Sequence, residues 1–215
     1  MKNKIRMIIS DMDGTIVHYE KGQFKSTWDA LYQGYGLQKE NMDLWDYYHD
    51  KKELENEWTD KLVGLLKGLP IKKGIENLFP IPYSKGVKPF FKDLSTKYIR
   101  GILTTGISFV AEAAREELNM NFALSFILNH KNELFDGTYD SRVKLWGKAD
   151  KLKEISDGLN ISLDSICFIG DNENDISCFE RVGLPIAFNP KTDRTTKSAR
   201  YCIDDFKEIN KILRA

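Results

Sequence analysis

The most constraining feature of the chain is an alternation, from residue 87 onward, of short apolar runs with helical patterns. The runs predict strands at 99–104, 124–128, 166–169, 186–188 and 201–203. The spacing of apolar residues between them predicts helices at 87–97, 108–118, 148–159, 174–182 and 205–213. Strands that alternate with helices indicate βαβ units. The predicted fold class is therefore α/β, with a doubly wound parallel sheet.

Two further segments complete this expectation. Asp136-Gly137, flanked by β-forming residues, predicts a hairpin turn within residues 132–143. Residues 18–83 are rich in Trp and Tyr, with helical spacing in the runs from Trp28 to Tyr35 and from Trp58 to Leu66. Aromatic stripes form protein cores more often than ligand sites. This segment is therefore predicted to be a small helical bundle with an aromatic core, inserted into the α/β domain.

The composition excludes several classes of protein. The 32 basic and 32 acidic residues cancel, so no global field attracts nucleic acid or an acidic membrane. We find no early signal-peptide pattern and no apolar run of about 18 residues, which predicts neither secretion nor a membrane span. Cys167, Cys178 and Cys202 lack metal-ligand spacing and are interpreted as buried thiols of a reducing compartment. The expected location is the cytoplasm.

Two carboxylates follow the first apolar run, Met7 to Ile9. Asp11 and Asp13 are two residues apart, so in an extended chain both project from the same face. Gly14 then allows a sharp exit from the strand. An Asp-x-Asp-Gly run can be a simple turn signal, but two carboxylates this close repel unless a cation, a proton or different roles separate them. A calcium loop starting at Asp11 fails, because it requires Gly and Glu at the sixth and twelfth positions, where Ile16 and Gly22 stand.

Other polar residues follow later strands, where ligands of parallel sheets bind. Thr105 and Gly106 enter a predicted helix and offer a hydroxyl and N–H groups suited to an anion. The strand at 166–169 leads into residues 170–175, which hold three carboxylates, more than helix capping explains. Lys148 begins a predicted helix, and taken alone it is most simply a solvated charge.

In this order, these residues resemble the four motifs of the haloacid dehalogenase superfamily of phosphohydrolases. The motifs are Asp11-Met12-Asp13-Gly14-Thr15, then Thr105-Gly106, then Lys148, then Gly170-Asp171 with Asp175. The resemblance covers the whole chain and implies a Rossmann-like core of residues 1–16 and 84–215. Residues 17–83 would form a type-one helical cap domain, called the cap segment below. The spacing from Lys148 to Asp171 is similar to that of the phosphoserine phosphatase subgroup.

The resemblance also implies roles for the residues. Asp11 would be the nucleophile that forms an aspartyl-phosphate, and Asp13 the general acid and base. Mg²⁺ would be held by the Asp11 carboxylate, the Asp13 backbone carbonyl and Asp171. Asp175 would bind Mg²⁺ through water or orient Lys148. The phosphate and substrate ligands would be Thr105, Gly106, Lys148, Asn174 and Glu20.

The identity of the substrate stays open at this point. Phosphoserine phosphatases hold the ammonium and carboxylate of their substrate with a Glu and an Arg of the cap. Glu20 is suitably placed for the first of these roles. The cap segment has no arginine, however, and Leu62 stands near the expected position, beside Lys61. We expect a phosphatase of a small phosphomonoester, acting as a monomer or homodimer. A phosphotransferase or phosphomutase, or a catalytically silent binding protein on the same scaffold, are the alternatives. Asp13 argues against a dehalogenase, which needs no acid there.

Overall fold

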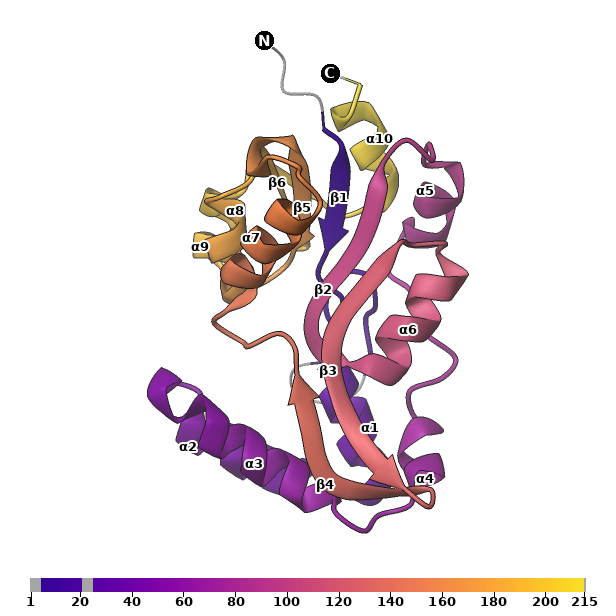
Figure 1. The fold of residues 1–215 in the computed structure, drawn as a ribbon, viewed down its shortest axis with the longest axis vertical. Coiled ribbons are helices and arrows are strands. Elements are labelled where there is room, and N and C mark those ends of the chain that lie inside the picture. The colour runs from indigo at the N-terminus through magenta and orange to yellow at the C-terminus, as the bar shows by residue number, and fades with distance from the viewer. Residues whose placement is uncertain (1–4, 21–24, 215) are drawn as a thin grey trace.

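The computed structural model describes residues 5–20 and 25–214. This part of the chain forms a seven-stranded sheet in the order β4-β3-β2-β1-β5-β6-β7 (Figure 1). All neighbouring strands are parallel except the pair β3 and β4. The strands are β1 (Met7–Ser10), β2 (Ile99–Ile107), β3 (Phe122–Lys131), β4 (Leu134–Ser141), β5 (Ile166–Gly170), β6 (Leu184–Phe188) and β7 (Tyr201–Ile203). The predicted α/β class with a mostly parallel sheet is confirmed.

The central strand β1 is buried along its whole length, as its Met-Ile-Ile sequence predicts for a strand covered on both faces. Its neighbours are in register, because Ser10 pairs with Ile102 of β2 and with Ile169 of β5. The carboxyl ends of β1 and β5 therefore lie side by side, and β2 continues past them to Ile107. Residues that follow them in the sequence are brought to one edge of the sheet.

Helices cover both faces of the sheet (Figure 1). Ile8 of β1 belongs to a core cluster that contains Phe90 and Val110, from α5 (Val87–Asp93) and α6 (Ser108–Glu117), and Ile209 from α10 (Ile209–Ile212). Met7 and Ile9 point the other way. They share a core with residues of α7 (Lys148–Gly158) and α8 (Ile176–Phe179), beside which lies α9 (Asp193–Ser198). The alternation of side chains along β1 thus divides the core into the two layers of a doubly wound fold.

The cap segment contains α1 (Thr27–Tyr35), α2 (Gln38–Tyr48), a 3-10 turn (Lys52–Leu54), α3 (Glu55–Leu66) and α4 (Ile71–Ile75). It lies beyond the carboxyl edge of the sheet, where α3 runs along the long hairpin of β3 and β4 (Figure 1). Backbone hydrogen bonds join Gly68 and Leu69 to Phe135 of β4. Leu31, Tyr32 and Leu66 belong to the same core cluster as the sheet. The helices pack on one another as predicted, but they share the core of the sheet instead of enclosing a separate one, and α3 is joined to β4.

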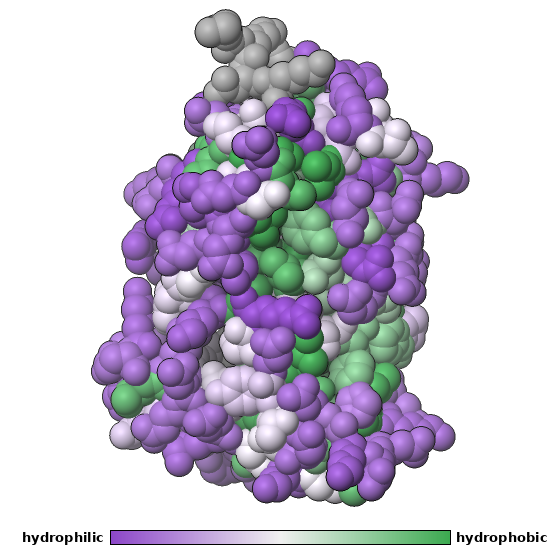
Figure 2. All heavy atoms as spheres, in the orientation of Figure 1, coloured by the Kyte–Doolittle hydropathy of each residue, from purple (hydrophilic) through white to green (hydrophobic). Residues whose placement is uncertain are grey.

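Hydrophilic side chains cover most of the face shown in Figure 2, and apolar side chains gather along its middle, over the strands. None of the helices within residues 5–20 and 25–214 combines the length and apolar character needed to span a membrane.

Three local predictions are wrong. The hairpin turn lies at Asn132 and Glu133, which adopt positive φ, whereas Asp136 and Gly137 lie inside β4. The reason is local bonding, since Asp136 accepts hydrogen bonds from the backbone N–H and hydroxyl of Thr138 within the strand. Cys202 is exposed, whereas Cys167 and Cys178 are buried as expected.

The third concerns helix length. The helix predicted at 87–97 ends at Asp93, and the guanidinium of Arg100 donates to the carbonyls of Phe91 and Leu94. This side chain satisfies helix-end carbonyls and replaces a further turn. The helix predicted at 174–182 is a 3-10 turn at Glu173–Asp175 followed by α8, and that at 205–213 is a 3-10 turn at Phe206–Glu208 followed by α10.

Candidate active site

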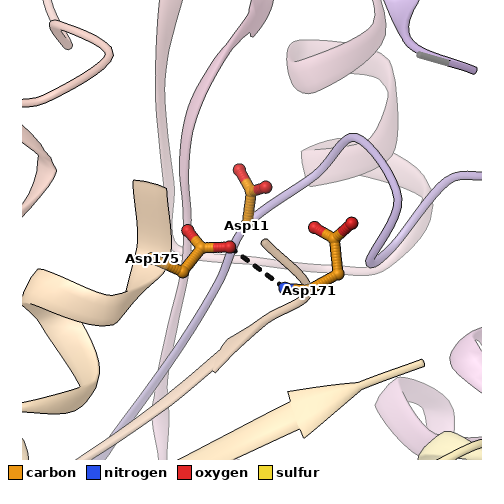
Figure 3. Close-up of side chains that lie close together, drawn as sticks. All are labelled: Asp11, Asp171 and Asp175. Atoms are coloured by element: carbon orange, nitrogen blue, oxygen red, sulfur yellow. Dashed lines mark hydrogen bonds between the residues drawn. The ribbon is translucent and has the colours of Figure 1, made fainter. Parts of the chain in front are cut away.

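Three buried aspartates meet at the carboxyl edge of the sheet. Asp11 follows β1, Asp171 follows β5, and Asp175 ends the 3-10 turn that comes next (Figure 3). One carboxylate oxygen from each lies within 4.8 Å of the others. The register of β1 and β5 causes this meeting, because Ser10, just before Asp11, pairs with Ile169, two residues before Asp171. Three like charges in a buried place require compensation by cations or protons.

Lys148 supplies part of this compensation. Its side chain is completely buried, and its Nζ lies 2.8 Å from Asp11 Oδ1 and 2.7 Å from Asp175 Oδ1. Burial alone would lower the pKa of Lys148, but the carboxylates of Asp11 and Asp175 outweigh it and raise the pKa. Lys148 is therefore a permanent cation inside the site, and the interpretation as a solvated charge is wrong.

Asp175 uses both of its oxygens in contacts within the protein. Oδ1 accepts a hydrogen bond from Lys148, and Oδ2 accepts hydrogen bonds from the backbone N–H groups of Asp171 (3.0 Å, dashed in Figure 3) and Asn172. Burial raises the pKa of Asp175 to about 7, although Lys148 lowers it. Of the two roles predicted for Asp175, this geometry favours the orientation of Lys148.

The remaining oxygens fit a divalent cation. Asp11 Oδ1 and Asp171 Oδ2 are buried, and neither accepts a hydrogen bond from the described residues. Their neighbours are ammonium groups at ion-pair distance, Lys148 for Asp11 and Lys191, 2.7 Å away, for Asp171. Burial raises the pKa of Asp171 to about 6, and Lys191 opposes this shift. Hard carboxylate oxygens with free lone pairs are the donor set that Mg²⁺ prefers.

Asp13 is held by the first residue of α1. The Thr27 N–H donates to Oδ1 at 2.8 Å, and the Thr27 hydroxyl donates to Oδ2 at 2.7 Å. Burial raises the pKa of Asp13 to about 7; the Thr27 hydrogen bonds lower it and the charge of Asp11 raises it. Near neutral pH this carboxyl group can therefore both give and take a proton. A Cβ on Gly106 would collide with Asp13 Oδ2, so a larger residue there would displace the Asp13 carboxylate.

A cavity of about 790 Å³ opens between the sheet edge and the cap segment. Asp11, Asp13, Asp171, Thr105 and Asn174 line it. The Asn174 Oδ1 is buried and accepts no hydrogen bond from the described residues, so it can serve a bound ligand.

Two of the predicted phosphate and substrate ligands, Gly106 and Glu20, are not placed as expected. The N–H of Gly106 donates to the Thr104 hydroxyl at 3.0 Å, so in this conformation it is already engaged. Glu20 is exposed and is not among the described residues that line the cavity. Lys61 is likewise exposed and outside the lining. The structure therefore gathers the acidic cluster, Lys148, Thr105 and Asn174, and it leaves the two cap residues aside.

The match to known families decides the assignment. Residues 103–215, more than half of the chain, match the family of haloacid dehalogenase-like hydrolases. The chain belongs to the haloacid dehalogenase-like hydrolases.

Curated relatives cover this hydrolase end to end. The phosphoserine phosphatase of Methanocaldococcus jannaschii is 28% identical over 218 residues, covering 100% of both chains. That of Campylobacter jejuni subsp. doylei is 27% identical, over 97% of this chain and 100% of the relative. Two solved structures, an apo phosphoserine phosphatase and a phospho-aspartyl intermediate analogue of phosphoserine phosphatase, superpose with a TM-score of 0.80 at 26% and 27% identity. They cover 97% of this chain, and the chain covers 98% and 99% of them. The predicted family, fold and phosphatase class are confirmed.

Two residues of the site, Lys191 and Thr27, were not predicted from the sequence. Lys191 lies two residues beyond Asn189, at the carboxyl end of β6, and the rule for parallel sheets could have drawn attention to it. Thr27 stands beside Ser26, the N-cap of α1, and the Ser26-x-x-Asp29 capping box marks the helix start. The capping signal predicts that start, but it does not reveal that Thr27 bonds to Asp13.

Proposed function

We propose that this hydrolase is a magnesium-dependent phosphatase that removes the phosphoryl group of a small phosphomonoester through phosphorylation of Asp11. The observation that carries the proposal is the buried cluster in which carboxylate oxygens of Asp11, Asp171 and Asp175 lie within 4.8 Å of one another beside Lys148. The similarity to phosphoserine phosphatases over the whole chain supports the same class of reaction.

Mg²⁺ would be held by the Asp11 and Asp171 carboxylates and the Asp13 backbone carbonyl. When bound, the ion offsets the repulsion between the Asp11 carboxylate and an incoming phosphate dianion. Lys148 contributes a second positive charge from inside the protein, fixed by Asp175. Thr105 and Asn174, which line the cavity, would hold phosphate oxygens.

In the first step, Asp11 attacks the phosphorus atom, and the bond from phosphorus to the ester oxygen breaks. Asp13, whose pKa near 7 lets it be protonated, gives its proton to that leaving oxygen. In the second step, Asp13 takes a proton from a water molecule, which attacks the phosphorus of the phosphorylated Asp11. Phosphate leaves and both carboxyl groups return to their starting state.

We further propose that residues 17–83 act as the cap of this site, with residues 1–16 and 84–215 as its core. Three contacts support this division of labour, since each crosses from the cap segment to the core. Thr27 bonds to Asp13, the Trp28 Nε1–H donates to the Thr105 carbonyl at 3.1 Å, and Glu55 accepts from the Leu145 N–H at 2.7 Å. A cap held in this way excludes bulk water from the reacting groups.

The test is the release of inorganic phosphate from 4-nitrophenyl phosphate with Mg²⁺ and with EDTA. We expect turnover that requires the metal. The same reaction with an added alcohol measures transfer, because a phosphotransferase would form a new ester in place of inorganic phosphate. A folded, magnesium-saturated protein without turnover on a panel of aryl and alkyl phosphates would contradict the proposal.

Magnesium should stabilise the protein more at high pH than at low pH. The folded-state pKa values of Asp13, Asp171 and Asp175 lie at about 7, 6 and 7, above the unfolded value of 3.8. The folded metal-free protein therefore binds more protons than the unfolded chain between these values, and its stability falls as pH rises through this window. Mg²⁺ takes the place of the protons.

One fixed Mg²⁺ concentration, about 100 times the Kd at pH 8, is expected to raise Tm by about 5 to 10 °C near pH 8 and by less near pH 5.5, where protons compete for the carboxylates. Thermal unfolding at both pH values measures this. Asp171→Asn should abolish the gain, whereas the exposed Asp93→Asn should keep it. A gain in the wild-type protein that is equal at both pH values would refute the assignment of the metal ligands.

Removing the Thr27 hydroxyl should impair the role of Asp13 as general acid and base. Thr27→Val leaves Asp13 Oδ2 without its donor and the Ile107 N–H without its acceptor, at a cost of about 1–3 kcal/mol of unfolding free energy. We expect kcat to fall roughly 10- to 100-fold, since a misplaced acid loses part of its contribution. Thr27→Ser, which keeps the hydroxyl, is the matched control. Equal kcat in the Val and Ser variants would show that this hydrogen bond does not position Asp13.

A further inference from the structure

All four tryptophans of the chain line the cavity that contains Asp11 and Asp13. Trp28, Trp45 and Trp58 come from α1, α2 and α3 of the cap segment, and Trp146 comes from the loop before α7. Trp28, Trp45 and Trp58 are only partly buried, and Trp146 is exposed. An aromatic core would bury these rings completely, as it buries Tyr32. These four side chains therefore form a wall of the cavity, here called the tryptophan wall.

The rings of the tryptophan wall are held in place by contacts with neighbouring side chains. The Trp28 ring meets Phe126 edge to face at 5.0 Å, and its Nε1–H is fixed on the Thr105 carbonyl. The Trp45 ring meets Trp58 edge to face at 5.5 Å and stacks on His49 at 5.0 Å. Such edge-to-face pairs orient rings firmly. Since Trp28 follows Thr27, which bonds to Asp13, the wall begins directly beside the predicted acid for the leaving group.

Among the described residues of the cap segment, three charged side chains, Asp50, Lys52 and Glu55, line the cavity, and each has a contact within the protein. Lys52 places its Nζ 4.1 Å from the centre of the Trp146 ring, and Glu55 accepts the Leu145 N–H. From the core, Arg194 lines the cavity but pairs with Glu173 at 2.9 Å. The cap segment contains no arginine, so it presents no guanidinium for the carboxylate of an amino-acid substrate. The cavity is also large, within the range that holds a drug-sized molecule.

We propose that the alcohol part of the substrate carries an aromatic ring, which the tryptophan wall holds while Asp11 and Asp13 act on the phosphate. This inference rests on the proposed function and names its substrate class. Aromatic rings bind well to orientated aromatic side chains, because the buried area and the edge-to-face geometry both favour them. A polar, zwitterionic group such as that of phosphoserine would lose hydration against the same wall and would meet no guanidinium of the cap segment.

The test compares phosphate esters of primary alcohols. We would measure kcat/KM for 2-phenylethyl phosphate, ethyl phosphate and phosphoserine, which all have alkyl leaving groups. Burial of a phenyl ring predicts a kcat/KM for 2-phenylethyl phosphate that exceeds that of ethyl phosphate roughly 10- to 100-fold. We also expect it to exceed that of phosphoserine. A preference for phosphoserine would overturn the inference and leave the proposed phosphatase function intact.

Variants of the tryptophan wall test whether these side chains cause the preference for the phenyl compound. Trp45→Leu should reduce the preference for the phenyl compound to within a few-fold of ethyl phosphate, and Trp45→Phe should keep most of it. Tyr47→Leu is the matched control, because Tyr47 lies on the same helix, is 57% exposed and is not part of the described cavity lining. An unchanged preference in a folded Trp45→Leu protein, and in Trp58→Leu, would contradict the assignment to this wall.

Binding can be separated from hydrolysis. Because all four tryptophans line the cavity, their fluorescence should change when 3-phenylpropylphosphonate, which cannot be hydrolysed, binds. Its Kd should be roughly 10- to 100-fold lower than that of propylphosphonate. If the protein showed this difference in Kd but hydrolysed none of the substrates, the aromatic ligand class would be supported and the proposed catalysis would be refuted. Equal Kd values, or no binding of either compound, would overturn the inference itself.

Discussion

Asp11→Asn is expected to lower kcat/KM for any phosphomonoester substrate by roughly 10⁴- to 10⁶-fold, the usual loss when a nucleophile is removed. The change keeps the size of the side chain and removes the charge that attacks phosphorus. It also removes one of three neighbouring carboxylates, while Lys148 keeps its ion pair with Asp175 at 2.7 Å. The variant should therefore stay folded, and steady-state kinetics together with thermal unfolding measure both effects.

The control for this variant is Asp93→Asn, an exposed aspartate at the end of α5. It should leave kcat/KM unchanged. If Asp11→Asn kept more than a few per cent of the wild-type rate, Asp11 could not be the nucleophile. A site in which water attacks phosphate directly would then replace the two-step reaction.

Lys148→Met is expected to reduce both activity and stability. The substitution removes the cation that lies within 2.8 Å of Asp11 and Asp175, two carboxylates that are almost completely buried. Breaking a buried ion pair in this way costs about 3–5 kcal/mol. For a chain of this size that corresponds to a loss in Tm of roughly 6–20 °C. Turnover should fall roughly 10²- to 10³-fold, as in sites that lose one group stabilising the transition-state charge.

Lys153→Met on the same helix separates the buried charge from helix effects. Lys153 pairs with Asp157 on the surface and is about half exposed, and such pairs contribute about 0–1 kcal/mol. We expect little change in its Tm or kcat. Should both lysine variants lose the same small amount of stability, the charge of Lys148 would have no special role in holding the acidic cluster.

Much of the site followed from two rules of strand geometry. Alternation along an extended chain predicts that Asp11 and Asp13 share a face, and the common edge of parallel strands predicts that Asp171 joins them. Both rules depend only on local sequence and on the fold class, which the alternating pattern after residue 87 made clear. The α/β class and the general location of the acidic cluster could therefore be predicted.

Contacts between distant segments could not be predicted in the same way. Thr27 reaches Asp13 and Lys191 reaches Asp171 only because the cap segment and the end of β6 fold over the same edge. The exposed position of Glu20 likewise depends on the path of the chain after β1, which a motif spacing does not specify. Local hydrogen bonds also decided the hairpin, where Thr138 bonds to Asp136 inside β4.

The aromatic residues of the cap segment illustrate a further limit. Helical spacing assigns Trp28, Tyr32 and Trp58 to the inner faces of helices, and this holds for all three. Tyr32 is buried in the core, whereas Trp28 and Trp58 line the cavity. Spacing alone does not tell a core from a cavity wall, because both are inner surfaces. That distinction is the basis of the inferred substrate class.

The central claim, phosphorylation of Asp11, is tested most directly by trapping the intermediate. The protein would be mixed with Mg²⁺ and substrate, quenched during turnover and treated with borohydride, which reduces an aspartyl phosphate to homoserine. Peptide mass spectrometry would then locate the change. We expect homoserine at position 11 in the presence of substrate and none in its absence. Turnover with an unmodified Asp11, or with the modification at Asp13, Asp171 or Asp175, would contradict the account.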